Sequence, residues 1–275
     1  HQIRGTLRMI LCEGGAVFAE EMRVAVHDLL GDLEAAPERA FEALLGATVQ
    51  LTDYLDALHN GETDNALVFL PLINELRVAR GAGVIAESAL FAHYAQLCEP
   101  LDSRSGPIEG RPDNAGQPRA RQHLAPFQAA LLGLLRDDAT AETLGRLEQV
   151  AADLAQTVAD RRGQRLFEAA AAVIEAIAAD GLACELEIKR LLGRVGQQLK
   201  AAAANGDRAL GDAPDALLYG LVYFVGRART DGPRVAALRE AYGLETLLPD
   251  PERLSRMRAR LRGPNTGLVN KLAAE

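Results

Sequence analysis

The residues at the start of the chain have the types and the spacing that phosphoryl transfer requires. His1 and Arg4 are three positions apart, so on a helix they lie on one face, and Gly5 follows them. An imidazole nitrogen is nucleophilic near neutral pH, and a guanidinium beside it attracts the transferred phosphoryl group. Gly5 has no side chain to obstruct a partner's active site. We therefore expect His1 to accept a phosphoryl group, Arg4 to hold it and Gly5 to clear the docking path.

This pattern is short and loosely specified, so a second interpretation of His1 stays open. His1 is then an ordinary exposed histidine. Four other histidines, His27, His59, His93 and His123, are interpreted as surface, cap or loop residues. None of them has a ligand partner at helical spacing, and the three cysteines are far apart, so the sequence predicts neither a metal site nor a disulfide framework.

The segment that carries His1 reads as the first arm of a helical hairpin. Apolar residues from Ile3 to Leu11 follow helical spacing, and the pair Gly14 and Gly15 is expected to break this helix. A second amphipathic helix follows and ends at Gly31. Its charged residues at 20–23 are expected to form a solvated face, with a docking surface as the alternative.

Further helices complete a first domain over residues 1–98. Pro37 opens a third helix with an apolar stripe from Phe41 to Leu58. Asp64 is expected to cap a fourth helix, and Pro71 inside it predicts a kink or a local restart near residue 70. A shorter helix over 85–97 closes this domain.

The rest of the chain predicts a linker, a second helical domain and a tail. Residues 99–120 are rich in proline and glycine and poor in large apolar residues, which is typical of a flexible linker. Long amphipathic stretches follow over 121–262, the last of them a basic helix that begins after Asp250 and runs through Arg262. Residues 263–275 are interpreted as a tail. The predicted class is all-α, with two antiparallel helical bundles.

Composition limits the classes of function. The net charge of −8 argues against nucleic-acid binding, because such proteins need a basic face. We expect protein partners. No apolar run reaches the length of a membrane span, and no signal peptide begins the chain, so we expect a cytoplasmic protein without membrane insertion. No cofactor is expected. Because the chain begins with histidine inside an amphipathic pattern, we also expect it to be a piece of a longer protein.

Four segments carry a resemblance to a known family: HQIRGTLRMI, DYLDALHNGETDNALVFLPLINELRVARG, LFEAAAAVIEAI and LLYGLVYFVGRA. They resemble the N-terminal region of the ChpA/PilL-type hybrid chemosensory histidine kinases of the type IV pilus system, a region shared with the FimL scaffold proteins. The resemblance implies histidine-phosphotransfer-like bundles and a role in a two-component system that controls twitching motility. It also implies, as partners, a kinase core, response-regulator receiver domains and pilus regulatory proteins, with recruitment to the cell pole.

The resemblance leaves two hypotheses for function. In the first, the chain is a phosphotransfer module in which His1 accepts phosphoryl; it has no kinase core of its own, so it could not phosphorylate itself. In the second, it is a non-catalytic scaffold that binds chemosensory and pilus-regulatory proteins. The corresponding helix of the second bundle, LFEAAAAVIEAI, has no histidine, so that bundle is expected to be inactive in phosphotransfer. A generic helical-repeat adaptor is a third option, although the sequence lacks a short repeat.

Overall fold

Helices are the only regular elements in the part of the chain that the computed structural model describes. That part comprises residues 2–31, 38–98, 116–136, 140–158, 160–206, 208–211 and 213–261, the side chains of 116–119 and 208 excepted. The all-α class is confirmed. Contacts divide the chain into two units, one formed by residues 1–99 and 249–275 and the other by residues 100–248.

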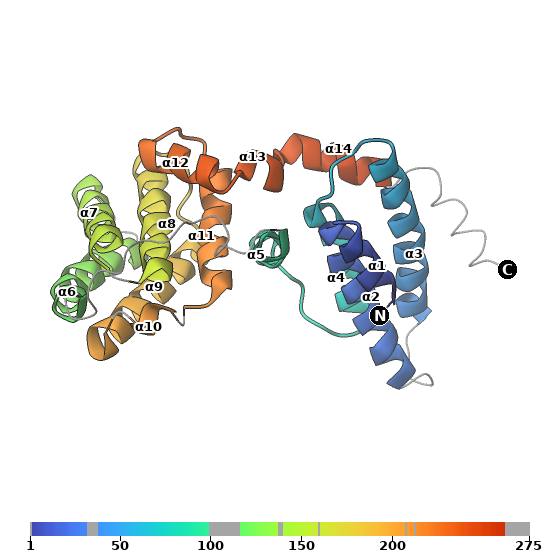
Figure 1. The fold of residues 1–275 in the computed structure, drawn as a ribbon, viewed down its shortest axis with the longest axis horizontal. Coiled ribbons are helices and arrows are strands. Elements are labelled where there is room, and N and C mark those ends of the chain that lie inside the picture. Colours follow the sequence, from blue (N-terminus) through green and yellow to red (C-terminus); the bar gives the residue numbers. More distant parts are fainter. Residues whose placement is uncertain are drawn as a thin grey trace. The chain divides into compact units, whose positions relative to one another are not determined.

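The first unit is built around a pair of helices near the start of the chain. α1 (Gln2–Met9) packs on α2 (Glu13–Gly31), and α2 packs on α3 (Glu38–His59) and α4 (Leu70–Ala79). The 3₁₀ helix η1 (Ala66–Phe69) and α5 (Glu87–Cys98) complete this side of the core (Figure 1). Phe18 stacks on Phe69 with the ring centroids 4.2 Å apart, and Tyr54 lies 4.5 Å from Phe69. These rings fix α2, α3 and η1 to one another.

The helix break between α1 and α2 lies a few residues before the predicted position. α1 ends at Met9, Leu11 has a left-handed backbone with φ of 58°, and α2 already begins at Glu13. Gly14 and Gly15 are therefore buried in the first turn of α2. A Cβ atom on Gly14 would lie 2.6 Å from an Asp64 carboxylate oxygen, so this position needs glycine for close approach and not for a helix break.

The segment before α4 confirms one prediction and corrects another. η1 ends at Phe69 and α4 starts at Leu70 with Pro71 in its first turn, which is the restart that Pro71 predicts. The cap of η1 is Asn65, whose side-chain oxygen accepts a hydrogen bond from the Leu67 amide. Asp64 does not cap the helix that follows it, because its carboxylate turns towards α2.

The basic helix α14 (Pro251–Leu261) belongs to the first unit and not, as expected, to the second domain. Its buried side chains are Leu254, Met257 and Leu261, and it packs on η1 and α3. In Figure 1 one end of α14 lies beside the end of α3. Arg258 donates hydrogen bonds to the Leu67 carbonyl at 2.8 Å and to the Glu87 carboxylate at 3.2 Å. The apolar side chains of α14 therefore pack on the unit, and Arg258 beside them binds a carbonyl and a carboxylate group that are far away in the sequence.

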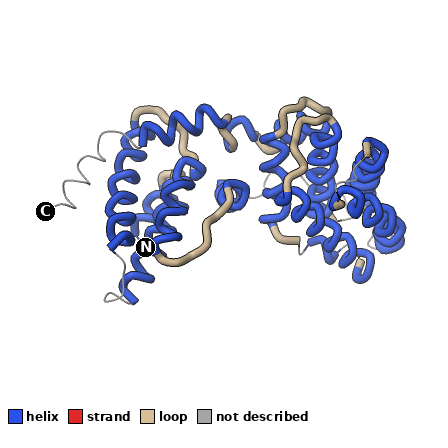
Figure 2. Tube along the Cα trace, turned by 180° about the vertical axis from the view of Figure 1, so that it is seen from behind, coloured by secondary structure: helices blue, strands red, loops and turns tan. Residues whose placement is uncertain are grey.

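The helices of the second unit are arranged around one central helix, α8 (Arg161–Ala178). Its elements are α6 (Gly116–Leu135), α7 (Ala141–Thr157), α8, α9 (Leu186–Asn205), α10 (Arg208–Gly211), α11 (Asp215–Arg227), α12 (Pro233–Ala241) and α13 (Leu244–Leu247). α8 packs against α7, α9, α10, α11 and α12 (Figures 1 and 2). The run Ala169–Ala172 in α8 is fully buried, because small side chains let the neighbouring helices approach closely.

The predicted linker and tail lie largely outside the described residues. Residues 99–115 and 262–275 are not described, so nothing tests their interpretation. The end of the predicted linker differs from expectation, because α6 begins at Gly116 and buries Ala120. His123 was expected in a loop and lies instead within α6, as does Pro126.

Candidate functional site

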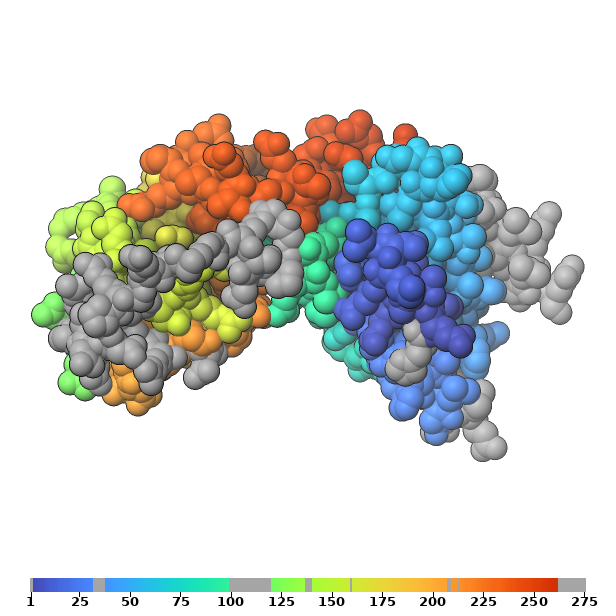
Figure 3. All heavy atoms as spheres, in the orientation of Figure 1, coloured from blue at the N-terminus to red at the C-terminus, as the bar shows by residue number. Residues whose placement is uncertain are grey.

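Two of the three predicted phosphotransfer residues lie on α1 at the surface of the first unit. His1 lies outside the described residues. Leu7 is the buried residue of α1, and the helix is on the face of the unit that Figure 3 shows in dark blue. A Cβ atom added to Gly5 would meet nothing within 4 Å. Among the described residues of the unit, therefore, no packing contact requires a glycine at this position.

Arg4 is held by an ion pair with α2. Its Nη1 lies 2.9 Å from Glu20 Oε2, and the two side chains keep 35% and 30% of their surface exposed. Arg8 pairs with Glu13 at 3.4 Å one turn further along α1. Both arginines of α1 therefore reach towards α2, which orients α1 on it.

Glu20 is shared between two arginines. Arg23 donates from Nε to Oε2 at 2.9 Å and from Nη2 to Oε1 at 2.8 Å, a two-pronged contact with both carboxylate oxygens. The hydrogen bonds from Arg23, together with the positive charge of Arg4, lower the pKa of Glu20 below its usual value. The carboxylate is thus ionised at neutral pH, and the guanidinium of Arg4 already has a strong anionic partner.

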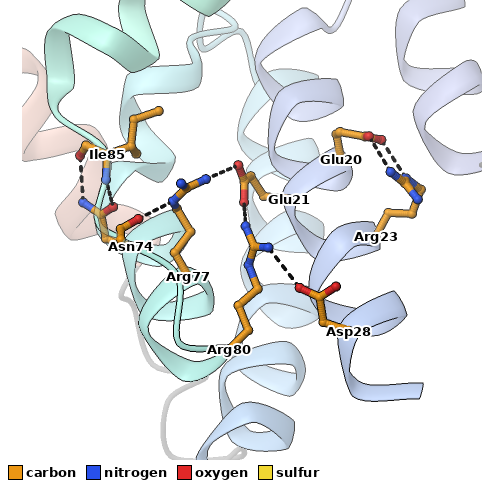
Figure 4. Close-up of polar contacts among 9 residues, drawn as sticks. Glu20, Glu21, Arg23, Asp28, Asn74, Arg77, Arg80 and Ile85 are labelled. Carbon is orange, nitrogen blue, oxygen red and sulfur yellow. Dashed lines mark hydrogen bonds and ion pairs between the residues drawn. The ribbon is translucent and has the colours of Figure 1, made fainter. Parts of the chain in front are cut away.

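The neighbouring residue Glu21 points to a different side of α2 and binds α4. Its carboxylate oxygens lie 3.0 Å from Arg77 and 3.1 Å from Arg80, and Arg80 also contacts Asp28 at 3.0 Å (Figure 4). Arg77 further donates to the Gly83 carbonyl at 2.7 Å. Glu21 and Arg80 are 21% and 14% exposed. The expected solvated face at 20–23 is therefore two separate ion-pair clusters, because consecutive helical residues point about 100° apart.

A polar cluster around Asp64 fixes the turn between α1 and α2. The Asp64 carboxylate accepts hydrogen bonds from the amides of Gly14 at 2.8 Å and Gly15 at 3.4 Å, so it caps α2 from a loop fifty residues away. Tyr54 donates its hydroxyl to the same carboxylate at 2.5 Å and accepts from the Asn65 amide at 2.7 Å. Asp64 is thus a helix cap, as the sequence predicts, but it caps α2 and not the helix that follows it.

Burial and this carboxylate shift the ionisation of its neighbours. The thiol of Cys12 is 3.5 Å from Asp64, and burial, with the negative charge of Asp64, raises the pKa of Cys12 to about 12. The same two causes raise the pKa of Tyr54. Tyr94 donates to the Asp64 carbonyl at 2.8 Å, and burial raises its pKa as well. Cys12, Tyr54 and Tyr94 are therefore neutral at physiological pH. The cluster stabilises the turn between α1 and α2, and none of these three side chains is a reactive nucleophile in it.

An open groove of about 520 Å³ lies between α3 and α4. It is lined by Arg39, Glu42, Ala43, Pro71, Asn74, Glu75, Val78 and Ala79. Val78 is 50% exposed in it, while Asn74 is held by two hydrogen bonds with the Ile85 backbone (Figure 4). An exposed aliphatic side chain with ionic residues at the rim is a combination that also occurs at interfaces between molecules.

The four remaining histidines lie on four different helices. His27 is 81% exposed on α2, His59 and His93 are exposed on α3 and α5, and His123 is half-buried. Over the described ranges, no three residues of the types His, Cys, Asp and Glu come together to bind a metal ion. Among the helices of these same ranges, none is long and apolar enough to cross a bilayer.

Comparison with known proteins gives a consistent answer over both units. Residues 112–255, more than half of the chain, match the family model described as the FimL scaffold protein second domain. The chain is 27% identical to the scaffold protein FimL of Pseudomonas aeruginosa (strain PAO1) over 272 residues, which cover 99% of the chain and 48% of that protein. The chain thus spans about half the length of this relative. No solved structure matches it. The chain belongs to the FimL scaffold protein family.

Proposed function

We propose that this chain is a non-catalytic scaffolding region of a chemosensory two-component signalling protein that controls twitching motility through type IV pili. Its partners are a kinase core, response-regulator receiver domains and pilus regulatory proteins, and it acts in the cytoplasm after recruitment to the cell pole. The curated relative is named a scaffold protein, and the match spans nearly the whole chain, which supports this role.

The ion pair between Arg4 and Glu20 is the observation that carries the proposal. A phosphotransfer site needs a cation free to attract the incoming phosphoryl group. Arg4 instead contacts Glu20 at 2.9 Å, and Glu20 is held in turn by Arg23. Recruiting Arg4 to a phosphate would require breaking an ion pair that already orients α1 on α2. Fixed charges of this kind suit a surface that is recognised and not one that reacts.

The second unit supports the same proposal. α8, the helix that we expect to correspond to a phosphotransfer helix, has no histidine and lies at the centre of its unit. Its alanine run has no exposed surface. A partner's active site could not reach a side chain in this run.

Phosphoryl transfer through His1 is the second candidate, and the open surface at Gly5 favours it. No side chain in the described part of the first unit would obstruct a receiver domain that approaches α1 at this residue. In this alternative His1 is the phosphoryl acceptor and Arg4 exchanges Glu20 for the phosphoryl oxygens.

The two candidates are separated by one substitution in the protein made from the complete reading frame. His1→Gln is compared with His27→Gln, an exposed histidine on α2, in partner pull-down, in twitching motility and in labelling with acetyl phosphate or the cognate kinase core. A scaffold predicts that both variants keep partners and motility. Acid-labile label that His1→Gln removes and His27→Gln retains, with motility lost in step, would refute the non-catalytic role.

Glu20→Gln sharpens this comparison because it releases Arg4. If phosphotransfer is the function, a free Arg4 should increase the rate of labelling. If the chain is a scaffold, Glu20→Gln changes only the attachment of α1, and no label is found in either protein.

A further inference from the structure

The solvent-facing side of α9 in the second unit is a row of cations. Arg190, Arg194 and Lys200 are exposed and lie on one side of the helix with Gln197, while the opposite side is buried in the unit. Leu186, 63% exposed, begins the same side. The acidic residues nearest to this row, Glu185 and Glu187, lie at the N-terminal end of α9 before the first of the three cations, and none lies between Arg190 and Lys200, although the chain as a whole has a net charge of −8.

These three cations make no ion pair within the residues that the structure describes. Other arginines of the second unit are held by carboxylates: Arg162 by Asp215, Arg234 by Glu148 and Arg239 by Asp231. In a chain with more acids than bases, partners for surface cations are plentiful. Among the described residues, three such cations in one row, none of them in an ion pair, therefore characterise the α9 face.

Helix stability does not explain the placement of these charges. The positive end of a helix dipole is its N-terminus, where anions stabilise and cations destabilise the helix. Arg190 lies in the second turn of α9, and the last turn contains no basic residue. The cations are also exposed, so they contribute little to the core. Their arrangement is better suited to an external anionic group than to the folding of the unit.

We infer that the α9 face, defined as Leu186, Arg190, Arg194, Gln197 and Lys200, docks an acidic surface of a protein partner. The inference rests on the proposed scaffold function and names the chemistry of one partner. The row from Arg190 to Lys200 is about 15 Å long at 1.5 Å per residue, which matches carboxylates on one face of a helix of three turns. Paired across an interface, such charges contribute orientation and association rate.

A protein is the better match among anionic partners. Nucleic acid requires a broad basic face to replace counterions, and this chain is acidic overall. A membrane surface requires large apolar side chains to insert, and the α9 face offers one leucine. A carboxylate-bearing helix needs neither, since three or four contacts along one line suffice.

The test compares two double charge reversals in the full chain. Arg190→Glu with Arg194→Glu changes the α9 face, and Arg146→Glu with Arg229→Glu makes the same change in net charge at exposed positions elsewhere in the unit. The probe is a fluorescein-labelled helical peptide with glutamates along one face, and its matched peptide has glutamines there. Binding is followed by fluorescence anisotropy at low and physiological salt, after circular dichroism has established that each variant is folded.

The α9 reversal should weaken glutamate-peptide binding about tenfold or more, and the control reversal should leave it within about twofold. Equal binding by both variants, or tighter binding of a DNA duplex or phosphatidylglycerol vesicles than of the peptide, would overturn the inference. Partner pull-down separates this result from the scaffold proposal. If the α9 variant retains every partner of the unmodified protein, the inference that the α9 face docks a partner is wrong, while the scaffold role stands. If the unmodified protein retrieves no partner, the scaffold role fails.

Discussion

Removing the Asp64 carboxylate should destabilise the first unit more than removing an exposed aspartate. In Asp64→Ala the Gly14 amide loses its cap and the Tyr54 hydroxyl loses its acceptor. Loss of a helix cap costs about 0.5–2 kcal/mol, and a buried polar group left without a partner costs about 1–3 kcal/mol. Solvent can reach part of this half-buried cluster, so we expect a decrease in the free energy of unfolding of about 2–4 kcal/mol.

Two more variants separate the contributions of the lost contacts to stability. Asp64→Asn keeps an acceptor oxygen for the Gly14 amide, so its cost should be about half that of Asp64→Ala. Tyr54→Phe removes the donor, and in the double variant Tyr54→Phe with Asp64→Ala the two costs should be less than additive, because both disrupt one hydrogen-bonded cluster. Asp56→Ala, an exposed position on α3, is the control and should change stability by less than about 0.5 kcal/mol.

The assay must report on the first unit, because the two units can unfold separately. Urea unfolding followed by hydrogen exchange of the amides in the first turn of α2 meets this need. These amides should exchange faster in Asp64→Ala, while those in the buried alanine run of α8 should not change. If Asp64→Ala is no less stable than Asp56→Ala, or if protection is lost equally in α8, the role of Asp64 as a remote cap is refuted.

Three further predictions concern the ion pairs and the buried thiol. The pKa of Glu20 is lower in the folded protein than its usual value of 4.5. Its ion pairs therefore stabilise the fold above pH 4.5, and this stabilisation is lost as the pH falls through the pKa of the folded state. The urea midpoints of the unmodified protein and of Glu20→Gln should differ at pH 7 and converge in acid. Cys12, buried and with a pKa raised to about 12, should react with a thiol reagent at pH 8 only after unfolding, and mass spectrometry that finds it labelled as fast as the half-exposed Cys98 would contradict this. Arg258→Ala should lower the stability of the first unit by about 1 kcal/mol and increase hydrogen exchange in α14, since it removes the hydrogen bonds to Leu67 and Glu87; unchanged exchange in α14 would show that apolar packing alone holds the helix.

Local signals in the sequence predicted the helices well, because each depends on residues within one or two turns. Pro71 correctly indicated a restart, and Asp250 before Pro251 correctly indicated the start of α14, where the Asp250 carboxylate accepts a hydrogen bond from the Arg253 amide at 2.8 Å. The amphipathic pattern also predicted α2, which runs as far as the predicted stop at Gly31. The periodicity of the apolar residues and the identity of the capping residues are both properties of the segment itself.

Contacts between distant segments could not be predicted in the same way. The pattern around Asp64 identifies a cap but does not say which helix it serves, and here the helix precedes it by fifty residues. The arginines of α14 show that the helix is basic, and not that Arg258 binds a carbonyl 191 residues away. The candidate site shows the same limit, because the spacing of His1 and Arg4 suggested a free cation, whereas Glu20 on the next helix occupies it.

The position of a helix within its unit decides which of its side chains a partner can reach. In α1 one residue, Leu7, is buried, so the rest of the helix faces its neighbour α2 or solvent. In α8 eleven residues are buried, because five other helices pack around it. A histidine introduced into the alanine run would have to displace packed neighbours, at a cost of the order of 1–3 kcal/mol, and would still face the interior. The buried run of α8 therefore cannot present a side chain to another protein, whereas the exposed face of α9, with Arg190, Arg194 and Lys200, can contact one directly.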